Sequence, residues 1–422
     1  MNDPHEPIPE LPNGAANRRN VSRRNFLASG GAATIGMGLS GEPHPALAVG
    51  QLPKKVRVGI AGGNFGATFQ FHEHPDCIVE AVTDLVPERR TRLMKTYGCQ
   101  KSYKSLEEMV LDDKIDAVAI FTDGPLHTKH VELAMRHGKH ALSAVPAAWA
   151  TLDDCEFLRG TVEKHGLTYM LCETGYYQPE VMAAREFHKQ GLFGEIFYCE
   201  SEYQHPRLDR LYSAEEKRTW RYGIAPMHYP THNTAKLISV TGERLTSVSC
   251  QGWGDDSPVL EDNDYNNPYW NEAALFRTDR GHAFRLCVWW LGAFRFAQRA
   301  EWIGSKMSLF MQQANGEEPV IVRTPQKEET NSKRRPQEHG TTEPFEPPVY
   351  WNTDLLPEPL RHKSGHWGSH CFLTHEFIDA IASDRKPSID LYEALAYTAP
   401  GIVAHDSALR KGELMKIPSF SP

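Results

Sequence analysis

The chain has 422 residues, too many for one hydrophobic core of ordinary size, so we expect two folded domains. Hydrophobic residues make up 40% of the chain and charged residues 24%, which is typical of a soluble globular protein. The formal net charge of -8 lacks the basic excess of a nucleic-acid-binding surface, so we expect no nucleic-acid partner.

The first predicted element is an export signal over residues 1–48. Arg23 and Arg24 precede an uncharged, glycine-rich and alanine-rich stretch over residues 28–41, and the Ala-Leu-Ala at 46–48 fits a cleavage site. This pattern resembles a twin-arginine signal peptide, whose route carries proteins already folded, often around a cofactor. No other segment has the roughly 20 apolar residues that span a bilayer, so we expect a periplasmic or otherwise exported protein without a membrane anchor. Eight dispersed cysteines with no C-x-x-C pair predict buried thiols.

Residues 49–175 are predicted to form a Rossmann domain. Residues 56–61 suit a buried parallel strand, which runs into a glycine turn and then an expected helix. Glycines allow positive φ angles and the close approach of a pyrophosphate, whose charge a helix N-terminus favours. The residues expected to bind the dinucleotide at this turn are Gly62, Gly63, Asn64, Phe65 and Gly66.

A second predicted strand, residues 78–83, ends on Asp84. This is the expected position for a carboxylate that accepts the ribose hydroxyls, so Asp84 predicts NAD as the cofactor. Arg89 and Arg90 follow closely and keep NADP as the alternative. Strand and helix then alternate, which predicts a doubly wound parallel sheet; the expected segments are a helix at 106–111, a strand at 117–121, a helix at 128–137 and a strand at 141–143.

Two motifs on this frame resemble those of the Gfo/Idh/MocA oxidoreductases. Residues 122–127, Thr-Asp-Gly-Pro-Leu-His, stand at the place of the family's T-P-x-x-x-H, and Gly-Lys-His at 138–140 stands at that of its G-K-H. The resemblance covers nearly all of the mature chain, including Gly194-Glu195 and the predicted helix at 375–381. It implies further cofactor-binding residues, namely Thr122, Pro125, His127, Ala144 and Pro146.

The chain departs from the family pattern after the G-K-H strand. Dehydrogenases of this family usually carry E-K-P there, with the lysine beside the nicotinamide, but this chain has Ala144, Val145 and Pro146. Valine has no titratable group, so it cannot supply general acid–base catalysis.

The family's second motif, D-x-G-x-H, corresponds to residues 228–232. The resemblance implies that His232 acts on the substrate hydroxyl, while His228 replaces the aspartate. The groups that could share a proton are then His232 and His228, or His232 and a tyrosine. Each histidine could instead be a structural, hydrogen-bonded residue. Pro230 lies between them and disfavours a shared helix face, and no third ligand is identifiable, so we predict no metal site.

Tyr177 is the candidate tyrosine, because its segment faces the nicotinamide pocket in this family. We place it with His232 and His228 as a catalytic residue. Aromatic residues are numerous in the second half of the chain, where they either stack on sugar rings or fill the core. The residues expected to contact substrate are Glu173, Trp220, Arg221 and Tyr229.

The same segments look like those of NAD-dependent glycosidases, including α-N-acetylgalactosaminidases. V-P-A-A at 145–148, the Glu and Tyr that follow, and Y-P-T-H at 229–232 carry this likeness. It implies transient oxidation at sugar C3, elimination of the glycosidic group, addition of water and return of the hydride. Those enzymes retain a glutamate at the position of Ala144, which this chain lacks.

Residues 176–422 predict an α+β domain with a largely antiparallel open sheet. Its expected strands are 197–203, 245–251, 272–277 and 283–290, and residues 324–348 predict a surface insertion. The family resemblance implies a homo-oligomer formed through this sheet.

Three functions follow from the sequence. The first is an exported NAD(P)-binding oxidoreductase that acts on a carbohydrate and recycles a tightly bound cofactor, since free dinucleotide is scarce outside the cytoplasm. The second is a redox-neutral, NAD-dependent glycoside hydrolase. The third is a catalytically inactive sugar-binding relative.

Overall fold

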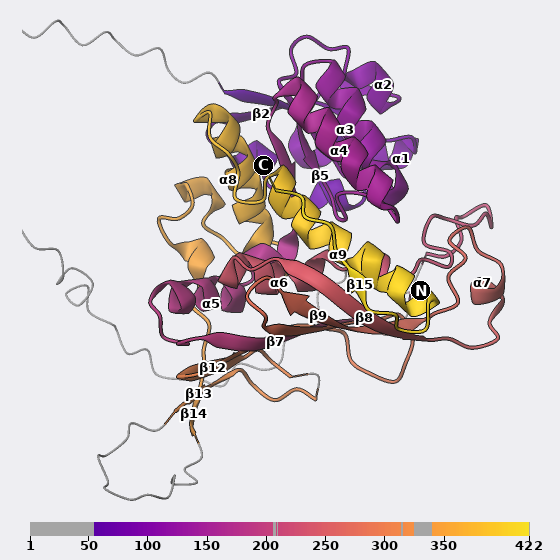
Figure 1. Cartoon of the computed structure of the whole chain (residues 1–422). Coiled ribbons are helices and arrows are strands. Elements are labelled where there is room, and N and C mark those ends of the chain that lie inside the picture. Colours follow the sequence, from indigo (N-terminus) through magenta and orange to yellow (C-terminus); the bar gives the residue numbers. More distant parts are fainter. Residues whose placement is uncertain (1–54, 206–207, 209, 314, 325–339, 422) are drawn as a thin grey trace, which may run out of the picture. The chain divides into compact units, whose positions relative to one another are not determined.

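The computed structural model describes residues 55–205, 208, 210–313, 315–324 and 340–421, so the expected export signal lies outside the described residues. The described chain contains two sheets with helices packed between and around them (Figure 1). Within the described ranges, no helix combines the length and apolar character that a membrane span requires. All eight cysteines are described, buried and free, which confirms the prediction of buried thiols.

The first sheet has six strands, all paired in parallel, in the order β3-β2-β1-β4-β5-β6. This is the doubly wound strand order of a Rossmann fold. The chain adds strands toward one edge of the sheet from β1 to β3 and toward the other edge from β4 to β6. The central strands are apolar because helices cover both faces of a parallel sheet. The strands are β1 (Val56–Ala61), β2 (Cys77–Thr83), β3 (Ser102–Tyr103), β4 (Ala117–Ile120), β5 (His140–Ser143) and β6 (Tyr169–Leu171).

Four α-helices connect these strands. Capping side chains fix two of their starts: Ser105 accepts a hydrogen bond from the Glu108 backbone, and Thr151 accepts one from the Asp154 backbone. Gly166 ends the last of them in the left-handed conformation, with φ of 62°. The helices are α1 (Pro87–Tyr97), α2 (Leu106–Met109), α3 (His127–Arg136) and α4 (Leu152–His165), which confirms the predicted alternation downstream of β2.

The prediction of a helix after the glycine turn is wrong. Two short 3-10 turns stand in its place, η1 (Phe65–Thr68) and η2 (Phe71–Glu73). Phe69 stacks on Phe121, with ring centres 4.6 Å apart, and on His370, with ring centres 4.2 Å apart. The phenylalanines of this segment therefore pack as an aromatic cluster, and their spacing does not build a helical face.

The second sheet has nine strands in the order β14-β13-β12-β11-β7-β10-β9-β8-β15. All neighbours pair antiparallel except β7 and β10, which confirms a largely antiparallel sheet. Residues 341–344 pair with β13, so the expected surface insertion at 324–348 ends in a sheet strand. The strands are β7 (Ile196–Gln204), β8 (Leu245–Trp253), β9 (Asn271–Thr278), β10 (Ala283–Trp289), β11 (Ala297–Gly304), β12 (Met307–Phe310), β13 (Val320–Arg323), β14 (Thr341–Pro344) and β15 (Met415–Lys416).

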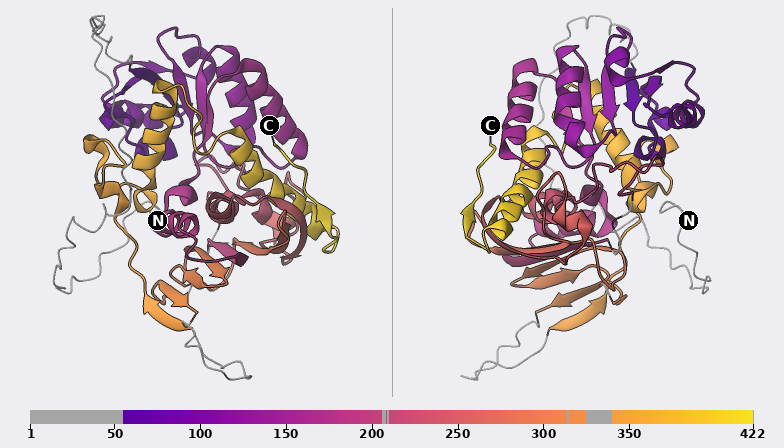
Figure 2. Two further views of the ribbon diagram at one scale, coloured as in Figure 1. Left: turned by 60° about the vertical axis from the view of Figure 1, so that its left-hand side comes forward. Right: turned by 90° about the vertical axis from the view of Figure 1, so that its right-hand side faces the viewer.

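Helices cover one face of this second sheet, the face directed toward the first sheet (Figure 2). The central helix α6 begins directly after Pro230 and ends at Gly242, and almost all of its residues are buried. Because helices lie on only one side, each strand presents alternate residues to α6 and to the open face. The helices of this part are α5 (Pro179–Lys189), α6 (Thr231–Thr241), α7 (Pro258–Glu261), α8 (Ser369–Ala382) and α9 (Leu391–Leu409).

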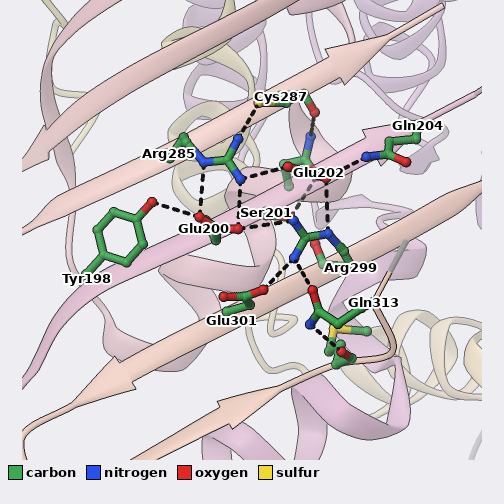
Figure 3. A network of polar contacts seen from close by, with 12 residues as sticks. Tyr198, Glu200, Ser201, Glu202, Gln204, Arg285, Cys287, Arg299, Glu301 and Gln313 are labelled. Carbon is green, nitrogen blue, oxygen red and sulfur yellow. Dashed lines mark hydrogen bonds and ion pairs between the residues drawn. The ribbon is translucent and has the colours of Figure 1, made fainter. Parts of the chain in front are cut away.

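The open face carries an ion-pair network across β7, β10 and β11 (Figure 3). Arg285 contacts both Glu200 and Glu202 at 2.7 Å, and Arg299 contacts Glu202 at 3.0 Å and Glu301 at 2.6 Å. The register of the strands explains this grouping, because Glu200 lies opposite Arg285 and Glu301, while Glu202 lies opposite Arg299. Each of these five charged side chains therefore has an opposite charge beside it.

Candidate functional site

A buried carboxylate and a histidine form the centre of the candidate site. Glu173 follows β6 of the first sheet and caps the 3-10 turn η4 (Thr174–Tyr177), while His232 stands in the first turn of α6. Glu173 Oε1 lies 2.7 Å from His232 Nδ1 and also accepts a hydrogen bond of 2.6 Å from the Gly175 backbone. The end of the first sheet and the helix beneath the second sheet thus meet at this pair.

The electrostatics of the pair favour an oriented, proton-accepting imidazole. Burial opposes ionisation of Glu173, but its electrostatic contact and hydrogen bond with His232 outweigh burial and hold the pKa of the carboxyl below its usual value. The carboxylate fixes the imidazole with Nδ1–H directed toward it. Among the described residues the one hydrogen bond of the His232 side chain is that of Nδ1, and the side chain keeps 7% of its surface exposed. Nε2 is therefore free to take a proton from a bound hydroxyl.

Two tyrosines flank His232. The ring centre of Tyr203, on β7, lies 5.1 Å from that of His232, and the ring centre of Tyr229 lies 5.4 Å from it. Tyr229 is half-buried, and burial raises the pKa of its phenol, so the hydroxyl stays protonated at neutral pH. The structure therefore brings together three of the predicted site residues: Glu173, His232 and Tyr229.

His228 belongs to a separate buried group. It lies in the 3-10 turn η5 (Pro226–His228), and its ring centre is 4.7 Å from that of His405 on α9. His405 Nδ1 lies 2.9 Å from Glu272 Oε1 on β9, and Glu272 Oε2 accepts the Met227 backbone N–H. Burial holds the pKa of His228 well below its usual value, so this imidazole is neutral.

Two expectations for this segment are corrected. His232 does not pair with His228, because Pro230 separates η5 from α6: His232 pairs with Glu173, whereas His228 packs on His405 and its Nδ1 has no hydrogen-bond partner among the described residues. Glu173 was expected to contact substrate, but its side chain is completely buried behind His232. Its role is to orient the imidazole.

Tyr177 does not join this group. Its ring stacks on Phe372 of α8, with ring centres 5.3 Å apart and nearly parallel planes, and its side chain lies near Glu376 and Ser388. Burial raises the pKa of the phenol well above its usual value. Tyr177 therefore packs against α8, whereas the tyrosines whose rings lie beside His232 are Tyr203 and Tyr229.

An aromatic group lies beside His228. Trp149 packs edge-on to Trp220 at 5.2 Å between ring centres, and the rings of Tyr265 and His228 follow at 5.7 and 6.4 Å. The Arg221 guanidinium lies over the Trp220 ring at 4.6 Å. The predicted residues Trp220 and Arg221 thus lie near His228. Trp149, which contacts both Trp220 and His228, is not among the residues predicted from the sequence.

Lys236 is a further buried group on the same helix as His232. It lies four residues later, its side chain is completely buried, and its Nζ has no hydrogen-bond partner among the described residues. Burial lowers the pKa of this amine to about 7, although Glu173 and Glu180 oppose the shift. The i, i+4 spacing places Lys236 on the helix face that carries His232.

The carboxyl ends of the first-sheet strands fit a dinucleotide. Gly62 has φ of 103°, and a Cβ there would lie 2.2 Å from the Phe121 carbonyl oxygen, so only glycine fits this turn. Asp84 accepts hydrogen bonds from the backbone N–H groups of Gly63, at 2.6 Å, and Val86, at 2.8 Å. Its side chain is partly exposed and its carboxylate keeps free lone pairs, so it can still accept ribose hydroxyls.

The other predicted cofactor residues surround this edge in different ways. Asn64 directly precedes η1 without a capping hydrogen bond from its side chain, and Phe65 contacts His366 and His370, with ring centres 5.6 and 5.5 Å apart. His127 is buried and lies within hydrogen-bond distance of the carbonyl oxygens of Thr122 and Pro146. It therefore holds the loops after β4 and β5 together and does not face a ligand. Thr122 and Pro125 are partly exposed, whereas Gly66, Ala144 and Pro146 are buried.

Several residues of the site carry no sequence signal of their own. The one sequence signal for Lys236 is its i, i+4 spacing from His232 in a predicted helix. His405 and Glu272 come from α9 and β9, far apart in sequence, and no spacing rule joins them. In the described part of the chain, no cluster of three or more His, Cys, Asp or Glu side chains is arranged to hold a metal ion.

The comparisons with known proteins agree with this architecture. The sequence profile of the family described as "Oxidoreductase family, NAD-binding Rossmann fold" (GFO_IDH_MocA) matches residues 56–172. A levoglucosan dehydrogenase, solved in complex with NADH and levoglucosan, superposes with a TM-score of 0.69 at 16% identity, covering 87% of this chain and 100% of that one. This likeness shows a shared fold.

Two curated relatives carry glycosidase names. A glycosyl hydrolase family 109 protein of Solibacter usitatus is 24% identical over 447 residues, covering 95% of this chain and 97% of that protein. An alpha-N-acetylgalactosaminidase of Bacteroides fragilis is 34% identical over 172 residues, covering 35% of this chain and 40% of that protein.

Proposed function

The chain belongs to the Gfo/Idh/MocA family of oxidoreductases through its NAD-binding Rossmann fold, and from this premise we propose that it oxidises a carbon bearing a hydroxyl group on a sugar. The observation that carries the proposal is the Glu173–His232 pair, a buried carboxylate holding an imidazole whose Nε2 has no hydrogen-bond partner in the part of the chain that the structure describes. Such a pair is suited to deprotonating an alcohol as it loses hydride.

Each part of the reaction has residues in this chain to support it. NAD, when bound, supplies the hydride acceptor, and the glycine turn with Asp84 would hold its adenosine half. His232 Nε2 takes the hydroxyl proton, and Glu173 stabilises the imidazolium that forms. Tyr229, protonated beside His232, donates a hydrogen bond to the substrate. Val145 stands where the family's lysine would act, so His232 carries the proton transfer here.

A redox-neutral glycosidase is the second candidate function. The relative from Solibacter usitatus, named a family 109 glycosyl hydrolase, aligns with 95% of this chain. A likeness that extends over both domains favours this alternative. Hydride removal and its return within one turnover would leave the cofactor unchanged overall. An inactive sugar-binding protein is the outcome if neither reaction occurs.

One experiment separates these functions. The purified protein is incubated with a panel of monosaccharides, methyl glycosides and aryl glycosides while the absorbance of reduced nicotinamide and the release of aglycone are followed together. Accumulation of reduced cofactor supports the oxidoreductase, and aglycone release without such accumulation supports the glycosidase. Sugar binding with neither signal in wild type overturns both enzymatic proposals.

We also propose export by the twin-arginine route, as the arginine pair in residues 1–48 predicts. Replacement of Arg23 and Arg24 by lysine is expected to retain the protein in the cytoplasm with its N-terminus uncleaved. N-terminal sequencing of the exported and retained fractions tests this, and equal export of the variant would contradict it.

The open face of the second sheet is proposed to mediate a homo-oligomer. In the described chain it bears no helix (Figure 2). Leu275 on β9, the cross-strand partner of Arg285, is 55% exposed. Light scattering of the purified protein, compared with Leu275→Glu, tests this assembly. A monomeric wild type would contradict it.

A further inference from the structure

A cleft beside the catalytic pair is lined by polar side chains and exposed rings. It has a volume of about 130 Å³, and its wall includes Gln178, Glu180, Phe296, Gln298 and Trp367. Ligand pockets for drug-sized molecules measure roughly 300–1,000 Å³, so this one suits a single ring. We call it the amide cleft, after its two buried glutamines.

The amide cleft lies next to His232 through the strand register. Gln298 on β11 is the direct cross-strand partner of Tyr203 on β7, so both side chains stand on the same face of the sheet. The ring centres of Tyr203 and His232 are 5.1 Å apart, and the ring of Phe296 lies 6.1 Å from that of Tyr203. Tyr203 therefore connects two residues of the cleft wall, Gln298 and Phe296, to His232.

One buried polar atom in the cleft lacks a partner. Gln178 is 1% exposed, and its Nε2 donates to Gln298 Oε1 at 3.0 Å, but its Oε1 has no hydrogen-bond partner among the described residues. Leaving a buried amide oxygen unpaired is costly, so a hydroxyl that donates to it is favoured. The Glu180 carboxylate adds a second acceptor, and Arg295, which also lines the cleft, adds a donor for sugar hydroxyls.

The two rings in the cleft are held exposed. Phe296 and Trp367 each keep 47% of their surface accessible. Trp367 lies in the 3-10 turn η8 (His366–Gly368), where His366 and Trp367 both adopt left-handed φ angles of 49° and 57°. Such conformations are costly for residues with a side chain and persist where the surroundings impose them, often at ligand sites. Exposed rings beside hydroxyl acceptors match the two faces of a sugar ring.

We propose that the amide cleft binds a second sugar ring of a substrate whose first ring reacts at His232, so that the natural substrates carry at least two sugar rings. This inference rests on the proposed function, because it places the reacting ring at the Glu173–His232 pair. Gln178 accepts a hydroxyl of the second ring, and Trp367 and Phe296 pack on its apolar face.

The test compares two substrates that share the reacting sugar, a disaccharide and the corresponding methyl glycoside, with the sugar chosen from the panel described above. We expect wild type to prefer the disaccharide by about tenfold in kcat/KM, the scale of a buried aromatic contact. Trp367→Ala and Phe296→Ala should remove this preference while leaving the rate on the methyl glycoside within about twofold.

Matched controls exist for both rings. Trp253, 54% exposed, and Phe197, 48% exposed, lie outside the cleft, and their alanine variants should keep the disaccharide preference. An unchanged preference in Trp367→Ala and Phe296→Ala, or no preference in wild type, overturns the proposal.

Calorimetry separates failure of the cleft from failure of the proposed function. If no sugar reduces the bound cofactor or releases an aglycone, the proposed function fails, and disaccharide binding to the full protein is then measured directly. Tighter binding of a disaccharide than of its methyl glycoside, lost in Trp367→Ala, supports the cleft on its own. Equal binding of the two overturns it.

Discussion

The two faces of the second sheet carry polar clusters of opposite character. On the open face, Arg285 and Arg299 contact three glutamates, and each of these charges has an opposite charge beside it (Figure 3). On the helix-covered face, Lys236 Nζ, Glu173 Oε2 and Gln178 Oε1 are buried without hydrogen-bond partners in the described chain.

The difference distinguishes a structural network from a site prepared for a ligand. Paired charges offset each other's desolvation, whereas unpaired buried groups lower stability and persist where function retains them. Removing a charge should therefore have opposite effects on stability at the two faces, and only the helix-covered face should affect catalysis.

The largest effect is expected from His232→Ala. Loss of a positioned general base should lower kcat about 10²–10⁴-fold, while NAD remains bound because the glycine turn and Asp84 are untouched. Steady-state kinetics and the cofactor content of the denatured protein measure the two effects. His137→Ala, at an exposed position at the end of α3, is the control. Wild-type kcat in His232→Ala would remove this residue from the mechanism.

Lys236→Met should stabilise the protein by about 1–4 kcal/mol near neutral pH, because it removes an unpaired buried amine. The pKa of Lys236 is lowered from 10.5 to about 7, so between these values the unfolded chain binds more protons and stability rises with pH. The gain from the substitution should therefore be largest below pH 7 and vanish above about pH 10.5.

Denaturant unfolding of both proteins across this pH range measures the gain. Lys139→Met is the matched control, since Lys139 is also buried but its Nζ donates to two carbonyl oxygens, at 2.9 and 2.8 Å. That variant should be less stable than wild type. A loss of stability in Lys236→Met as well would show that its amine has a partner.

Arg285→Met should have the opposite sign to Lys236→Met. It leaves Glu200 and Glu202 with one arginine and should lower the free energy of unfolding by roughly 1–3 kcal/mol, less than for a fully buried pair because Arg285 is 33% exposed. Turnover per folded molecule should stay at the wild-type value. Unchanged stability would make the open-face network dispensable.

The smallest effect is expected from Tyr177→Phe. The hydroxyl lies beside Ser388 and Glu376 and the ring packs on Phe372, so kcat should change by less than about twofold. A loss of kcat comparable to that of His232→Ala would restore the original assignment of Tyr177 as acid or base.

The alternation of apolar runs and glycine turns was sufficient to predict the first sheet and the strands β7 to β10. Periodicity failed after Gly66, where packing of Phe69 against Phe121 and His370 replaces the expected helix. His370 comes from α8, about 300 residues later, so no local pattern could reveal this contact.

The candidate site was predicted in part. The motif predicts His232, but the partners it offers are His228 or a tyrosine, because spacing in sequence does not show that Pro230 divides the segment into two elements. Glu173 was selected for a different role, since burial is a property of the folded chain. Lys236 and Gln178 carry no sequence signal of their own. Each is notable because a buried polar atom of its side chain has no hydrogen-bond partner among the described residues, and only the folded structure shows this.

The central claim is that His232 takes a proton from a sugar hydroxyl as that carbon loses hydride. Its most direct test is a single-turnover experiment in which protein with bound oxidised NAD is mixed with the best substrate of the panel and the absorbance of reduced nicotinamide is followed in time. Wild type should show a rise in this absorbance, transient for a glycosidase and lasting for an oxidoreductase, and His232→Ala should show none with equal cofactor content. An equal rise in His232→Ala, or no rise in wild type with substrate bound, would contradict the account.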